Sequence, residues 1–251
     1  MDGNQATETN ILFKCCRVFQ KVFQLCPLTQ QEVAAIYSTI FLPTITYPFP
    51  ATTLSIKDLE QAQSMTTPTI ISHMGYNRNM PKAVIYAPLT HGGLGLKHLY
   101  TEQGVQKALQ VIKHLRTRTT LGELMQTAIK AYQIQAGLPN SILEDTQLLL
   151  WLPHQWISNL REFLHSIEGK IVLENPWTIP KLRQYDTHIM DEFLQANVSP
   201  KDLQTLNNCR MYLQVTTLAE IATHDGTQIL VKAFQRGQTT PSLQTISKSL
   251  L

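Results

Sequence analysis

Helical periodicity with clear start signals is the feature that most constrains the fold of this chain. Between Asn10 and Phe23 apolar residues recur every three or four positions, which predicts an amphipathic helix. Three later segments open with a hydroxyl residue followed three positions on by an acid: Thr29 with Glu32, Ser55 with Asp58, and Thr120 with Glu123. Such pairs satisfy the free N–H groups of a helix start, so each predicts a helix N-terminus.

Prolines and glycines mark where these helices are expected to end. Pro43 should stop the second helix, and LPTITYPFP (42–50) should form an extended turn. Pro68 should kink or divide the helix that Ser55 starts. The same signals predict a short helix closed by Pro88 and longer helices over 97–118, 120–136, 156–167 and from Ser199 onward.

The predicted fold class is therefore all-α, with two small helical lobes. Residues 1–140 form the first lobe, residues 141–235 the second, and the polar tail 236–251 is expected to fray. At most a minor β element is expected over residues 170–173, KIVL.

Composition narrows the class of protein further. No run approaches the roughly 18 apolar residues of a membrane span, so no membrane contact is expected. The acidic start MDGNQATETN does not resemble a secretory signal, and the four cysteines lack metal-ligand spacing. We therefore expect a cytoplasmic or nuclear protein with free thiols, no metal and no cofactor.

Basic residues gather in one window of the sequence. Seven bases minus one acid give a balance of +6 between Gln61 and Arg118, although the whole chain carries only +3. Such a patch predicts contact with a polyanion. The candidate nucleic-acid-binding residues are Arg78, Lys82, Lys97, His98, Lys107, Lys113, Arg116 and Arg118. Lys170 and Lys181 lie outside the window and are expected to contribute little. A solvated helix face remains the simpler alternative.

The glycine run GGLGLKH (92–98) has two interpretations. It does not match a dinucleotide fingerprint or a P-loop, because the required third glycine and the Gly-Lys-Ser/Thr triplet are missing. Gly92, Gly93 and Gly95 are therefore expected to form a structural turn into the next helix. Alternatively, free N–H groups at that helix start, flanked by Lys97 and His98, would bind a phosphate without catalysing a reaction.

Three stretches resemble a known family. ITYPFPATTLS (45–55), MGYNRNMPKAVIYAP (74–88) and GGLGLKHLYTEQG (92–104) are similar to the thumb and connecting region that follows the catalytic palm in reverse transcriptase-like proteins of retrotransposons, particularly non-LTR elements. The similarity covers roughly residues 25–135, and NNCRMYLQVTTLAEIATHDGT (207–227) resembles a more distal part of the same polypeptides. The resemblance implies an all-helical module that contacts the backbone of an RNA/DNA hybrid or duplex, alongside palm and fingers.

The catalytic signature of that family is absent from this sequence. Its polymerases hold two metal ions with palm carboxylates, typically in Tyr-x-Asp-Asp, and no Asp-Asp pair occurs here. The expected function is therefore a non-catalytic, C-terminal thumb-like portion of a retroelement reverse transcriptase, and not an enzyme. The alternatives are a degenerate fragment, or a helical protein–protein interaction module, without nucleic-acid function.

Overall fold

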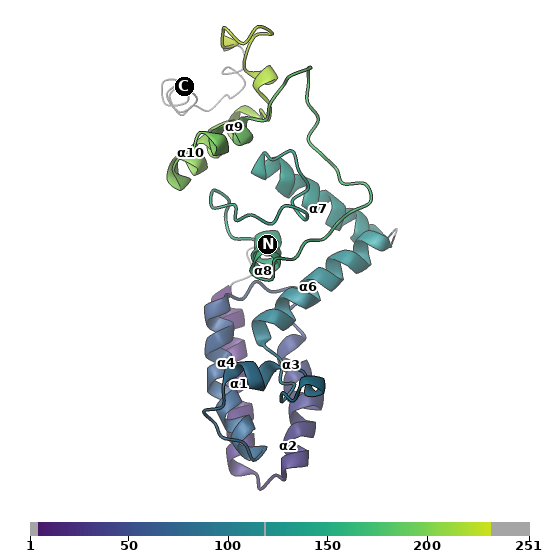
Figure 1. Ribbon diagram of the computed structural model, residues 1–251, viewed down its shortest axis with the longest axis vertical. Helices are drawn as coiled ribbons and strands as arrows, with labels where there is room; N and C mark the ends of the chain where they lie inside the picture. Colours follow the sequence, from purple (N-terminus) through teal and green to yellow (C-terminus); the bar gives the residue numbers. More distant parts are fainter. Residues whose placement is uncertain (1–4, 118, 232–251) are drawn as a thin grey trace. The chain divides into compact units, whose positions relative to one another are not determined.

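The computed structural model describes residues 5–117 and 119–231, and this part of the chain is all-α (Figure 1). Within it no strand forms, and β pairing is limited to isolated bridges that join His188 to Thr217 and Ala222 to Ile229. The predicted all-α class is confirmed. The first part of the helical order is α1 (Gln5–Leu25), α2 (Gln30–Ile36), π-helix η1 (Tyr37–Phe41), α3 (Leu42–Thr46), α4 (Ile56–His73), α5 (Lys82–Tyr86) and 3₁₀ helix η2 (Leu89–His91). It continues with α6 (Leu99–Arg116), α7 (Thr120–Ala136), α8 (Trp156–Ser166), α9 (Ile189–Gln195), α10 (Pro200–Leu213) and 3₁₀ helix η3 (Leu218–Glu220).

The chain divides into two compact units, whose boundary falls inside α6. The N-terminal unit runs to Val111 and the C-terminal unit begins at Ile112. This differs from the boundary near residue 140 that the sequence suggests. The reason is that the residues after α7 do not form a linker: Leu138, Ile142 and Leu143 are buried. The tail 236–251 lies outside the described residues.

In the N-terminal unit α1 and α4 lie side by side (Figure 1). The capping pairs form as expected: the Glu32 carboxylate accepts the Thr29 N–H at 2.8 Å, and the Ser55 hydroxyl accepts the Asp58 N–H at 3.1 Å. Pro68 lies within α4 without dividing it. The helix starts are therefore determined locally, by side chains adjacent in sequence.

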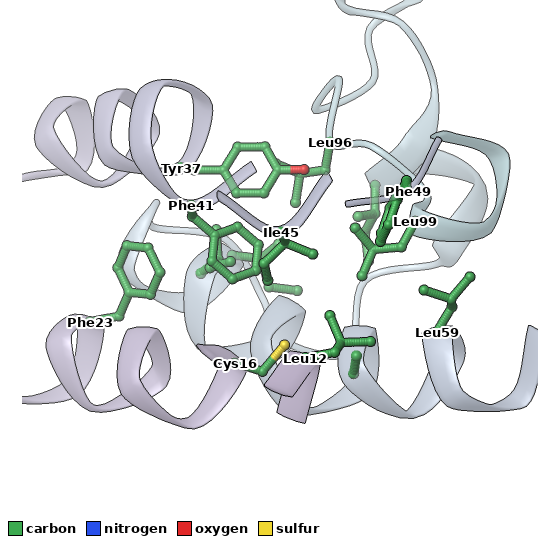
Figure 2. Packing of buried hydrophobic residues seen from close by; sticks show 14 of the residues in the cluster. Leu12, Cys16, Phe23, Tyr37, Phe41, Ile45, Phe49, Leu59, Leu96 and Leu99 are labelled. Atoms are coloured by element: carbon green, nitrogen blue, oxygen red, sulfur yellow. The ribbon is translucent and has the colours of Figure 1, made fainter. Parts of the chain in front are cut away.

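An aromatic and aliphatic core holds this unit together. Phe41 is its centre, with the Phe19 ring edge-on at 5.1 Å and the Tyr37 ring stacked at 5.7 Å. Figure 2 shows the Tyr37 hydroxyl extending from this core toward Leu96. All four cysteines are free, but only Cys16 is buried, and burial raises the pKa of its thiol to about 12.

The expected extended turn over LPTITYPFP is wrong for its first half. Leu42–Thr46 is α3, and the turn begins at Tyr47. The π-helical turn η1 precedes it, and the Leu42 N–H donates to the Tyr37 carbonyl five residues back. Pro43 therefore does not stop the helix: it follows the π-helical turn as the second residue of α3, within a continuous run of helical residues over 30–46.

Buried arginines organise the C-terminal unit. Arg210 of α10 donates from Nη2 to the Ile134 and Gln135 carbonyls in the last turn of α7, both at 2.8 Å. Arg161 of α8 donates to the Ile142, Asp145 and Gln147 carbonyls of the segment that follows α7. Each guanidinium thus satisfies carbonyls that end a helix or lie in a buried loop.

The strand that the sequence allowed over 170–173 does not form. The Ile171 N–H donates to the Leu143 carbonyl at 2.9 Å, but no ladder of such bonds follows. The sequence reading also missed α9, a helix of seven residues. The capping residue of α7 lies one position earlier than the Thr120/Glu123 pair predicted, because the Thr119 hydroxyl, not that of Thr120, accepts the Gly122 N–H at 3.2 Å.

Candidate nucleic-acid interface

The glycine run forms a tight turn that pairs with α5. The N–H groups of Leu94, Gly95 and Leu96 donate to the carbonyls of Val84, Ala87 and Ile85, at 3.0, 2.9 and 3.1 Å. Gly92 ends η2 with a φ of 76°, in the left-handed region that glycine enters without strain. A Cβ at Gly93 would lie 2.1 Å from the Ala87 carbonyl oxygen, so only glycine fits there. This geometry agrees with the structural turn.

The start of α6 has little capacity left for a phosphate. The Lys97 N–H donates to the Tyr37 hydroxyl at 2.8 Å, and the Leu99 N–H donates to Gln63 Oε1 at 3.2 Å. The Gln63 amide also donates to the Lys97 carbonyl at 2.9 Å. Two of the N–H groups at this helix start are therefore already bonded by side chains of η1 and α4, which weakens the alternative interpretation of the glycine run as a phosphate site.

His98 lies in a partly buried setting that disfavours a positive charge on its ring. Its ring lies edge-on to Tyr86, with centroids 5.2 Å apart, and Nδ1 lies 3.2 Å from the Thr101 hydroxyl. Partial burial lowers the pKa of the His98 imidazole below its ordinary value, and the charge of Lys82 lowers it further, whereas Glu60 opposes the shift. The lowered pKa and the packing against Tyr86 make His98 a weaker candidate for a phosphate-binding cation than the exposed lysines and arginines.

Lys107 does not fit the predicted interface either. Its relative exposure is 0 %, so its ammonium group cannot reach a phosphate outside the fold. Charge counting along a sequence does not distinguish the two faces of a helix, so it cannot separate the buried Lys107 from exposed lysines of α6. Arg118 lies outside the described residues.

The remaining candidates are exposed, but they belong to different units. Arg78, Lys82 and Lys97 are exposed in the N-terminal unit, and Lys113 and Arg116 are exposed in the C-terminal unit. Lys97 is partly neutralised, since its Nζ lies 3.8 Å from the Glu102 carboxylate. Arg78 and Lys82 have no described carboxylate within ion-pair distance. Of the predicted binding residues in the described part of the N-terminal unit, Arg78 and Lys82 are therefore the two that are exposed and have no such ion pair.

The C-terminal unit contains basic residues that the sequence reading overlooked. A cavity of about 1020 Å³ is lined by Arg116 at the end of α6, Lys130 in α7 and Lys170 in the segment before Trp177. Lys130 and Lys170 lie outside the basic window, and their separation in sequence gave no signal that they share a cavity. Lys170, which is expected to contribute little to nucleic-acid binding, therefore lines the same cavity as the predicted binding residue Arg116.

Other kinds of site have no support in the part of the chain that the structure describes. No group of three or more His, Cys, Asp or Glu side chains there could hold a metal ion. None of the helices in residues 5–117 and 119–231 combines the length and apolarity needed to cross a membrane. Comparisons of the chain with models of protein families, curated proteins and solved structures find no match. The similarity to retroelement polymerases thus rests on the sequence stretches alone.

Proposed function

We propose that this chain is a non-catalytic, thumb-like portion of a retroelement reverse transcriptase-like protein that binds the backbone of an RNA/DNA hybrid or duplex. The observation that supports this best is the pair of exposed, uncompensated bases Arg78 and Lys82, which lie in and beside the MGYNRNMPKAVIYAP stretch. Phosphate contacts fix the position of a nucleic acid and carry no base information, so binding is independent of sequence.

Several features of the N-terminal unit favour binding of a nucleic acid over catalysis. The polar groups around the start of α6 bond to one another, and the Tyr37 hydroxyl is kept protonated because burial raises its pKa to about 12. The Tyr37 hydroxyl therefore does not act as a general base at neutral pH. The exposed guanidinium of Arg78, in the turn before α5, and the exposed ammonium of Lys82, at the start of α5, instead match the requirements of electrostatic backbone binding.

A salt titration tests this function. The wild-type chain is expected to bind a hybrid duplex weakly, with affinity that falls steeply as salt rises. Replacing Arg78 and Lys82 with alanine should lower affinity equally for all sequences. It should also reduce the slope of log K against log salt by about 1.8, because each neutralised phosphate contributes roughly 0.9 on duplex DNA. Fluorescence anisotropy at several salt concentrations measures both quantities.

The matched control replaces Lys14 and Lys21, which are exposed on α1 in the same unit. This variant removes the same charge and should keep the wild-type slope. Equal slopes for the Arg78/Lys82 variant and wild type, or no binding near 50 mM salt, would refute backbone binding by these residues.

A specific feature of α1 supports the alternative, a protein–protein interaction module. Four apolar side chains of α1 are exposed: Ile11 by 56 %, Val18 by 54 %, Val22 by 36 % and Leu25 by 79 %. Their spacing of seven, four and three residues places them on one face of the helix. Exposed apolar stripes of this kind are typical of helix-in-groove binding. If this module is the function, a Val18→Glu variant should remove concentration-dependent association in analytical ultracentrifugation, while nucleic acid should not bind the wild type.

A further inference from the structure

The cavity of the C-terminal unit combines three positive charges with an aromatic wall. Its basic residues come from three separate elements: Arg116 from the last turn of α6, Lys130 from α7, and Lys170 from the 170–177 segment. Glu174 is the single acid among the residues that line it. Three bases minus one acid leave a balance of +2 around the cavity.

The segment that carries Lys170 is anchored to the unit. The Ile171 N–H donates to the Leu143 carbonyl at 2.9 Å, and the Leu173 N–H donates to the Glu144 carboxylate at 3.4 Å. Ile171 itself is buried. None of the three bases has a described carboxylate within ion-pair distance, so their charge is available to a ligand.

The rest of the lining is suited to a flat apolar group. Ile112, Leu115 and Ile129 form an aliphatic wall, and the Trp177 indole supplies an aromatic face. Stacking of a nucleic-acid base on such a ring is tolerant of base identity, because every base has a π-face. The volume of about 1020 Å³ is at the upper end of small-molecule sites, which span about 300–1,000 Å³.

These properties together match one class of ligand. A phosphate monoester carries close to two negative charges at pH 7, which equals the balance of the lining, whereas an internal phosphodiester carries one. We propose that this cavity binds a nucleotide with a terminal phosphate, with the phosphate between Arg116, Lys130 and Lys170 and the base against Trp177. The ligand is either a free nucleoside monophosphate or the phosphorylated end of a strand. This site shares no residue with the Arg78/Lys82 pair.

Isothermal titration calorimetry with defined probes tests the site. AMP should bind more tightly than either adenosine or inorganic phosphate, because only AMP uses both halves of the cavity. Replacing Lys130 and Lys170 with glutamine should weaken AMP binding about a hundredfold, since each charge-assisted hydrogen bond is worth roughly tenfold. Replacing Trp177 with alanine should weaken AMP by about tenfold and leave phosphate unchanged. The matched control, Lys181→Gln with Lys201→Gln, changes two exposed lysines outside the cavity and should bind AMP like wild type.

Two further probes identify the source of the nucleotide. A short single strand with a 5′-phosphate that binds at least as tightly as AMP, while its unphosphorylated form does not, supports a strand end. AMP binding without strand binding supports a free nucleotide.

Three results overturn the proposal: no AMP binding at millimolar concentration, wild-type affinity in the Lys130/Lys170 variant, or phosphate that binds as tightly as AMP. Because Arg78 and Lys82 are unchanged in every cavity variant, the salt titration on duplex succeeds or fails independently.

Discussion

Replacement of Arg210 with methionine is expected to lower the unfolding free energy of the C-terminal unit by about 3 kcal/mol, since buried acceptors lose a charged donor. The side chain is only 1 % exposed, and burial lowers the pKa of its guanidinium to about 10. Methionine retains much of the apolar stem and removes the donors, so the experiment isolates the hydrogen bonds.

The size of the effect follows from how many elements Arg210 joins. Nη2 donates to the Ile134 and Gln135 carbonyls of α7, and Nη1 donates to the Val215 carbonyl at 3.2 Å, beyond the end of α10. Nε donates to the Asn207 side chain at 3.1 Å within α10. In the variant, the Ile134 carbonyl keeps the Gly137 N–H at 3.1 Å, whereas the Gln135 and Val215 carbonyls and Asn207 Oδ1 lose the donors that Arg210 gives them.

Urea denaturation followed by tryptophan fluorescence measures this effect, because Trp151, Trp156 and Trp177 all lie in the C-terminal unit. The matched control is Arg183→Met, which removes one hydrogen bond, from Nη1 to the Thr223 carbonyl at 2.8 Å. Its expected cost is about 1 kcal/mol. Equal midpoints for the two variants would show that Arg210 is not a structural link between α7 and α10.

The helices themselves were largely predictable from the sequence, because their signals are local. Thr29, Ser55 and Ser199 cap their helices with residues that lie three positions away. Periodicity and capping need no tertiary information. The π-helical turn before Pro43 and the short helix α9 were not predictable, since neither has a capping pair and both depend on packing.

The candidate interface was less predictable than the helices, because burial and spatial proximity are tertiary properties. A charge count treats Lys107 and Lys113 alike, although both lie on α6 and only Lys113 is exposed. Likewise, Lys170 and Arg116 line the same cavity although α7 and α8 separate them in sequence. The basic window therefore indicates a region of the sequence. Which of its side chains are available to a ligand can be identified only from the fold.

The glycine turn gives the second large expected effect. Replacing Gly93 with alanine should destabilise the N-terminal unit by about 3 kcal/mol, because the new Cβ would lie 2.1 Å from the Ala87 oxygen and 2.5 Å from the Ala87 carbonyl carbon. The neighbours are backbone atoms, so no side-chain rotation relieves the clash. The turn would have to move away from α5, which breaks the hydrogen bonds from Gly95 to Ala87 and from Leu96 to Ile85.

Gly92→Ala is the matched control for this change, one residue earlier in the same turn. A Cβ at Gly92 meets no atom within 4 Å, so its cost is limited to the strained φ of 76°, about 1 kcal/mol. Thermal melts followed by far-ultraviolet circular dichroism should therefore place Gly93→Ala well below Gly92→Ala, and both below wild type. Since the tryptophans all lie in the C-terminal unit, the fluorescence transition should shift less than the dichroism signal in Gly93→Ala. The reverse order of the two variants would mean that the turn is shaped by its positive φ angles and not by close packing against α5.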